Sequence, residues 1–275
     1  MTMPSRSTGR RLPVSKEYHA KKATPQDTSG PVSKSLLWQF GKSPWKWAHQ
    51  VASQPTAAMN LGSVVHAITL EPDKTAEVFV VSEYDSFRTK EAREWRDQKA
   101  AEGLIVLNEK DYLAAAAMAH RATEELHRAL GGDHVGYKAE QEVTGSINGV
   151  NVCGLIDVVP DDGETIWDLK TCSSIGDERS LQRTVFDFGY HVQAALYCDL
   201  MSAETEKEPS FGFIFVETAV PYETTHIILD RDCILAGRAK YMELINKWAQ
   251  LRDKPLDEWP GSVERGIVME PPSWA

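Results

Sequence analysis

The sequence has few cysteines and lacks the apolar segments that direct proteins to membranes. Its four cysteines in 275 residues, at positions 153, 172, 198 and 233, form no CxxC pair. This spacing argues against a zinc ribbon or a cysteine-ligated iron–sulfur cluster, and the length excludes a small disulfide-stapled scaffold. No apolar run approaches the roughly 20 residues that span a bilayer, and residues 1–30 contain no signal-peptide core. We therefore expect a cytoplasmic protein with no membrane partner.

An excess of positive charge is also missing, since 30 Lys and Arg face 40 Asp and Glu, for a net charge of −10. This balance argues against a protein that holds nucleic acid only by neutralising its phosphates, because such a protein is usually basic. Residues 1–30 are the exception: they hold six basic and two acidic side chains with few large apolar ones. We predict a disordered basic tail there. Such a segment is more often solvated and without a role than in contact with phosphates. If the remainder handles DNA, the contact must be local and assisted by a metal ion.

Hydrophobic patterning predicts a single domain over 31–275, with a helical part over about 31–132 and an α/β core over about 133–252. Ser33 is the expected N-cap of a helix over 34–40 that ends at Gly41. Further helices are expected from Ser43-Pro44 and over 61–70, 85–102 and 109–130, with a strand over 78–81. The core is predicted to hold strands over 137–147, 150–159, 164–170, 211–218 and 224–229, and helices over 190–202 and 231–252.

The Asn148-Gly149 dipeptide, a strong signal for a two-residue hairpin turn, fixes the register of the first two core strands. In that register Glu140 lies directly opposite Asp157. If the loop after Pro160 has an even number of residues, Asp157 faces Ile166 and has Asp168 as a diagonal neighbour about 7–8 Å away. An odd loop or a bulge would instead send Asp157 to the opposite face of the sheet.

An even loop gathers Glu140, Asp157, Asp168 and Lys170 on one face among apolar neighbours. Buried carboxylates repel one another and are costly to desolvate. A hard divalent cation resolves this, because carboxylates, a backbone carbonyl and waters form a ligand set that Mg²⁺ accepts. The alternative is a salt bridge between Asp168 and Lys170 at the sheet surface, and the spacing alone favours neither.

Two predicted helices carry further polar residues among apolar ones. Gln193 and Tyr197 are four residues apart and therefore share a face of the helix that follows the strand with Asp168. His66 lies one turn after Gly62 on a short apolar helix. Each of these side chains, taken alone, is more often a satisfied core residue than a functional one.

Together these segments resemble the PD-(D/E)xK nuclease superfamily, in its RecB-like branch and its exodeoxyribonuclease VIII-like group of phage-type nucleases. The resemblance rests on five segments in this order: VSKSLLWQFGKSPWKW (32–47), LGSVVHAITLEP (61–72), GLIDVVP (154–160), Asp168-Leu169-Lys170 and YHVQAALY (190–197). It implies a restriction-endonuclease-like α/β (α+β) core, with a central mixed sheet flanked by helices and a helical N-terminal half.

The resemblance also implies a role for each matching residue. The metal ligands would be His66, Asp157, Asp168 and the backbone carbonyl of Leu169. Lys170 would orient or activate the attacking water, and Gln193 and Tyr197 would support that lysine and touch the DNA backbone. Glu140 has weaker motif support, and we include it in the site because of its expected pairing with Asp157.

The implied activity is Mg²⁺-dependent degradation of double-stranded DNA from a free end, 5′→3′, during recombination in a bacterial or phage-infected cell, with Mn²⁺ as a substitute metal. The resemblance also implies a single-strand annealing protein as a partner, and family members can form ring-like homo-oligomers. Some RecB-like nucleases carry an iron–sulfur cluster, which the cysteine spacing argues against here. Three alternatives stay open: a catalytically silent DNA-binding or assembly module, a structure-specific endonuclease, and a metal-dependent hydrolase of another substrate.

Overall fold

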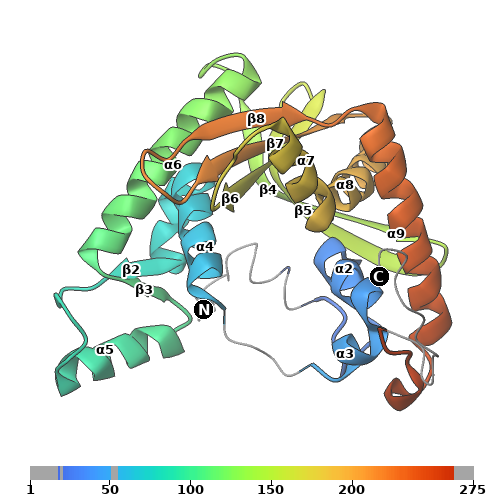
Figure 1. The fold of residues 1–275 in the computed structure, drawn as a ribbon, viewed down its shortest axis with the longest axis horizontal. Coiled ribbons are helices and arrows are strands. Elements are labelled where there is room, and N and C mark those ends of the chain that lie inside the picture. The colour runs from blue at the N-terminus through green and yellow to red at the C-terminus, as the bar shows by residue number, and fades with distance from the viewer. Residues whose placement is uncertain (1–17, 19–20, 51–54, 263–275) are drawn as a thin grey trace, which may run out of the picture.

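A mixed six-stranded sheet forms the centre of the molecule in the computed structural model, which describes residues 18, 21–50 and 55–262 (Figure 1). Strand β5 pairs with β4 along one side, and on its other side with β1 near its start and with β6 near its end; β7 and β8 follow β6. The β1–β5 and β6–β7 pairs are parallel and the others are antiparallel. The strands are β1 (Val32–Ser33), β4 (Tyr137–Ile147), β5 (Val150–Pro160), β6 (Thr165–Cys172), β7 (Ser210–Glu217) and β8 (Thr224–Ile228).

Helices cover both faces of this sheet. One face packs against α2, α8 and α9, and the other against α4, α6 and a small parallel sheet of β2 and β3. In Figure 1, α6 and α9 run down opposite sides of the molecule. The bounds are α2 (Lys34–Lys42), α3 (Pro44–Ala48), α4 (Ala57–Leu70), β2 (Phe79–Val81), α5 (Lys90–Ala101), β3 (Ile105–Leu107), α6 (Glu109–Leu130), α7 (Glu178–Asp187), α8 (Tyr190–Thr205) and α9 (Arg231–Leu251).

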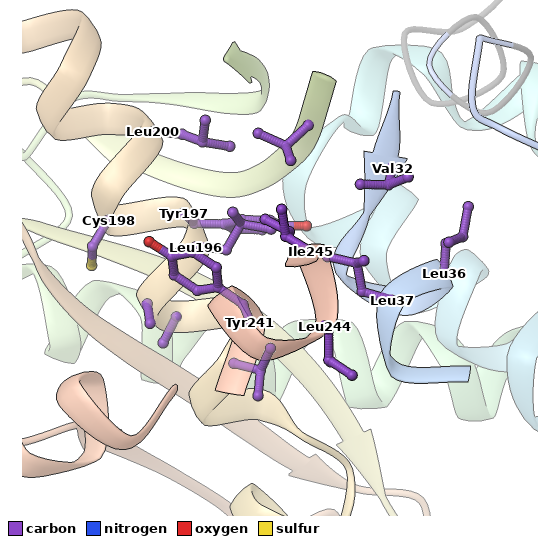
Figure 2. Close-up of a cluster of buried hydrophobic side chains, with 14 of the residues drawn as sticks. Val32, Leu36, Leu37, Leu196, Tyr197, Cys198, Leu200, Tyr241, Leu244 and Ile245 are labelled. Atoms are coloured by element: carbon purple, nitrogen blue, oxygen red, sulfur yellow. The ribbon is translucent and has the colours of Figure 1, made fainter. Parts of the chain in front are cut away.

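The larger hydrophobic cluster joins the N-terminal helix to the two C-terminal helices. Figure 2 shows Leu37 of α2 beside Leu244 and Ile245 of α9, with Leu196 of α8 in the same cluster. All four side chains are buried. Burial of this kind contributes roughly 1.5–3 kcal/mol for each large apolar side chain, so the packing fixes α2 and α8 relative to the sheet.

Most helix boundaries follow from local capping. Asn108 caps α6 by accepting a hydrogen bond from the Asp111 backbone, and Gly131, with φ +82°, ends this helix as expected. The end predicted for α2 at Gly41 is wrong, because the helix continues to Lys42. A Cβ on Gly41 would lie 2.5 Å from the Leu244 side chain, so this glycine admits α9 and does not terminate α2.

Several elements differ from the sequence-based expectation. Helix α7, strand β1 and strand β3 were not predicted, α4 begins four residues earlier at Ala57, and α5 begins only at Lys90, where Thr89 caps it. Because β1 and β3 have only two and three residues, they are too short to show periodicity. Among the described residues no helix is long and apolar enough to cross a membrane.

The structure also differs from the predicted disordered tail over residues 18 and 21–30, the part of residues 1–30 that it describes. Tyr18 and Ala23 are buried, and the Ala23 N–H donates to the Pro31 carbonyl. Lys21 forms an ion pair with Glu142 of β4 at 3.3 Å. This part of the segment therefore packs against the sheet. Residues 1–17, 19–20, 51–54 and 263–275 lie outside the described residues.

Candidate active site

Glu140 and Asp157 lie opposite each other in the β4–β5 hairpin, as the turn predicts. Ile147 pairs with Val150 at the turn, and the same register holds on both sides of Glu140. The pair itself is missing from the ladder because Glu140 has a left-handed backbone with φ +52°. Residues other than glycine rarely adopt this backbone conformation, and such strain concentrates at functional sites.

The β5–β6 register differs from the expectation by two residues. The turn over 161–164 has an even number of residues, as the expected pairing required. It has four residues and not two, however, so Val158 pairs with Trp167. The predicted pairing of Asp157 with Ile166 is therefore wrong, and Asp157 is level with Asp168. The Asp157 carboxylate accepts a hydrogen bond from the Leu169 backbone N–H at 2.8 Å. This carboxylate thus lies at the opening between β5 and β6, where their ladder ends.

His66 completes a cluster of potential metal ligands from the other side of this opening. It extends from α4, with Nδ1 3.4 Å from an Asp157 carboxylate oxygen and Nε2 2.7 Å from the Leu169 carbonyl oxygen. One ligand atom each from His66, Glu140 and Asp157 lie within 4.8 Å of one another. Three of the four expected metal ligands, His66, Asp157 and the Leu169 carbonyl, are therefore adjacent, and Glu140 lies beside them.

Asp168 is held by two other groups. Its carboxylate forms an ion pair with Lys170 and accepts a hydrogen bond from the Gln193 amide of α8. The alternative of an Asp168–Lys170 salt bridge therefore describes a real contact, but Asp168 is buried and not at the sheet surface. Within the described residues, the contact from Gln193 to Lys170 runs through this shared carboxylate.

Burial and the repulsion between neighbouring carboxylates both disfavour negative charge in this cluster. Burial raises the pKa of Glu140 to about 8, with further contributions from Asp157, Glu71 and Asp168. Burial and Asp168 raise the pKa of Asp157 to about 6, against the opposing effect of His66 and Lys170. Burial lowers the pKa of Lys170, but Asp168 and Asp157 outweigh it, so Lys170 stays protonated. Carboxylates that repel one another beside an imidazole form a donor set that fits a divalent cation.

Tyr197 has a supporting position on α8. Its ring packs so closely on β5 that a Cβ on Gly154 would lie 2.5 Å from it. The side chain is buried, burial raises its pKa, and its hydroxyl bonds to the Leu155 backbone. Because Tyr197 does not line the cavity described below, the implied contact with the DNA backbone stays a prediction.

The cluster lines a cavity of about 600 Å³. One wall is α4, through Met59, Gly62, Ser63 and His66. The remaining lining includes residues that the sequence did not single out, notably Glu71 and Tyr190. Tyr190 stands three residues before Gln193 on α8, one turn away, so helical spacing is the signal that would have found it.

Comparison with known proteins agrees with this arrangement. A family described as a PDDEXK-like domain of unknown function (DUF3799) matches residues 33–266. The chain belongs to this family. No curated protein matches it.

One solved structure shows the same restriction-endonuclease-like architecture. A "putative exonuclease" from Eubacterium rectale matches with a TM-score of 0.65 at 14% identity, over 96% of each chain. A phage-related exonuclease from Haemophilus somnus 129PT also matches at 14% identity, over 73% of this chain and 96% of its own, but its TM-score of 0.36 is too low to carry an argument. The family and the fold therefore agree with the PD-(D/E)xK resemblance and support a nuclease.

Proposed function

We propose that this protein is a metal-dependent DNA nuclease, and that its substrate is double-stranded DNA with a free end, degraded 5′→3′ during recombination. One observation carries the proposal: His66, Glu140 and Asp157 converge on a single cavity that Lys170 also lines. A cation donor set with an adjacent half-buried ammonium suits hydrolysis of a phosphodiester, in which negative charge develops on phosphoryl oxygens.

The residues that would hold Mg²⁺, or Mn²⁺ in its place, are His66, Asp157 and the Leu169 carbonyl, with Glu140 and Asp168 beside them. A bound divalent cation would supply Lewis-acid polarisation of a phosphoryl oxygen and a lower pKa for a coordinated water. Because that positive charge is local, the net charge of −10 does not prevent nucleic acid from binding at the cavity.

The protein's own contribution centres on Lys170. Its ammonium is kept charged by Asp168 and Asp157, and it lines the cavity, where it can orient water and neutralise charge on the phosphate. Gln193 fixes the Asp168 carboxylate and so fixes the position of Lys170. Tyr197 packs on β5 at Gly154, three residues before Asp157, and holds that strand against α8.

The direct test incubates the protein with Mg²⁺ and three substrates: linear duplex, closed circular duplex and single strands. We expect the linear duplex to shorten from its 5′ ends, as read from 5′- and 3′-labelled strands, while circles persist and chelator stops the reaction. Failure to degrade any substrate would contradict the nuclease, and cutting of circles would replace the exonuclease with an endonuclease.

A substitution separates the nuclease from a catalytically silent binding module. Lys170→Ala should abolish cleavage and retain DNA binding, whereas Lys138→Ala, which removes an exposed lysine of β4, should leave cleavage unchanged. Equal activity of wild type and Lys170→Ala would remove Lys170 from the mechanism.

We further propose a ring-like homo-oligomer and a single-strand annealing protein as partners, because the resemblance to phage-type exonucleases implies both. Light scattering coupled to size exclusion tests the first proposal. A monomer at micromolar concentration would contradict it. Co-elution with a recombination annealing protein tests the second, and separate elution of the two proteins would contradict it.

A further inference from the structure

Lys34 is a buried lysine that the proposed mechanism does not use. It is the first residue of α2, the residue is only 8% exposed, and its Nζ donates a hydrogen bond to the Phe188 carbonyl at 2.7 Å. Within the described part of the chain, no carboxylate forms an ion pair with it. Lysines are almost never this buried unless they are paired. Burial and, to a smaller extent, the charge of Lys170 lower the pKa of Lys34 to about 7, against the opposing effect of Asp168.

This ammonium lies beside the catalytic region. Its Nζ is 5.1 Å from the centroid of the Tyr190 ring, and Lys170 Nζ is 5.0 Å from the same centroid. Tyr190 and Lys170 both line the cavity. Two ammonium groups therefore share one aromatic ring at the cavity wall. Asp168 forms its ion pair with Lys170 and attracts Lys34 from a greater distance.

The start of α8 adds to the local positive character. The Phe188 carbonyl that Lys34 contacts directly precedes Gly189, the N-cap of this 16-residue helix, which has no side chain to cap the first turn. Free N–H groups and the helix dipole favour an anion at such an end. With Lys34 next to it, this region is cationic in a protein that is acidic overall.

We propose that Lys34 binds a phosphate of the nucleic-acid strand next to the one hydrolysed beside Lys170, so that the site holds two neighbouring phosphates of one strand. The inference rests on the proposed function and adds a second phosphate contact to it. A bound phosphate would give Lys34 the anionic partner that no described carboxylate provides at ion-pair distance.

A purely structural role and a phosphate-binding role for Lys34 predict opposite changes in stability when the lysine is replaced. If Lys34 serves only to fix the turn between α7 and α8 through Phe188, Lys34→Met lowers the melting temperature and leaves DNA affinity unchanged. If Lys34 is kept for phosphate, Lys34→Met retains the packing of the apolar stem and removes an uncompensated charge. The melting temperature then stays the same or rises while DNA affinity falls.

The experiment measures DNA affinity by fluorescence anisotropy over a series of salt concentrations, with Mg²⁺ and an Asp168→Asn background that prevents cleavage. We expect Lys34→Met to weaken binding about tenfold and to reduce the slope of log K against log salt by about 0.7–0.9, the loss of one phosphate contact. Lys34→Arg should keep the parental slope. The matched control is Lys42→Met, which removes an exposed lysine from the same helix and should also keep it.

An unchanged slope in Lys34→Met would overturn the proposal, and so would an equal loss in Lys42→Met, which would indicate only a general charge effect. A lower melting temperature with unchanged affinity would assign Lys34 a structural role. No DNA binding by the parental protein would overturn the proposed function itself, together with this inference.

Discussion

Two clusters of this molecule contain buried carboxylates, and their surroundings shift the carboxyl pKa values in opposite directions. Glu125 of α6 is surrounded by donors: His226 Nδ1 at 2.7 Å, Thr224 Oγ1 at 3.1 Å and the Arg128 guanidinium. Burial would raise the pKa of Glu125, but the hydrogen bonds from His226 and Thr224 and the charge of Arg128 hold it below its usual value. This cluster stabilises its own carboxylate.

The cluster at the β5–β6 opening does the reverse. The pKa values of Glu140 and Asp157 are raised to about 8 and 6, because burial and neighbouring carboxylates disfavour their charged forms. A buried acidic residue is therefore not by itself a sign of function. The informative property is charge that the protein does not neutralise, since a ligand can then neutralise it.

Among changes to the carboxylates of the two clusters, the largest expected effect comes from removing a charge at the β5–β6 opening. Asp157→Asn should lower cleavage of linear duplex by about 10²–10³-fold while leaving the fold intact, because the Leu169 N–H keeps an acceptor. Circular dichroism and single-turnover cleavage measure the two properties. Cleavage within a fewfold of wild type would contradict the assignment of Asp157.

A smaller loss of cleavage is expected at Gln193, which contacts the site through Asp168. Gln193→Ala removes the hydrogen bond that fixes Asp168 and should lower cleavage or metal affinity about 10–100-fold. Lys170 keeps its ion pair in this variant, so the reaction should be slowed and not abolished. Gln193→Glu, which places another carboxylate against Asp168, should be worse than Gln193→Ala, and equal rates would count against a direct role for this bond.

The neutralised cluster should respond in stability and not in activity. Glu125→Gln should cost about 1–3 kcal/mol in the free energy of unfolding, because His226 and Arg128 lose their carboxylate partner. Urea denaturation measures the loss, and cleavage per folded molecule should change less than twofold. A large fall in cleavage with unchanged stability would erase the difference between the two clusters.

The smallest effect has the opposite sign. The raised pKa of Glu140 gives the metal-free protein stability that is complete below the ordinary carboxyl pKa and is lost as the pH rises through about 8. In chelator, Glu140→Gln should therefore gain stability over wild type between pH 5 and 8, on the order of 1 kcal/mol. With saturating Mg²⁺ the order should reverse. A stability difference in chelator that does not change with pH would contradict the raised pKa of Glu140.

Local sequence patterns predicted much of this fold and site. The Asn148-Gly149 turn placed Glu140 opposite Asp157, and helical spacing placed Gln193 and Tyr197 on one buried face. The β5–β6 register could not be predicted, since a two-residue and a four-residue turn have the same parity and similar polar residues. Lys34 was also beyond reach, because its position depends on contacts with residues more than 150 positions away.

The most direct test of the central claim is the anomalous scattering of Mn²⁺ in crystals of the protein. We expect a single strong peak, or two adjacent ones, in the cavity between His66, Glu140 and Asp157, and its loss in Asp157→Asn crystals. Occupancy only at surface carboxylates, with the cavity empty at millimolar Mn²⁺, would contradict the metal site on which the nuclease proposal depends.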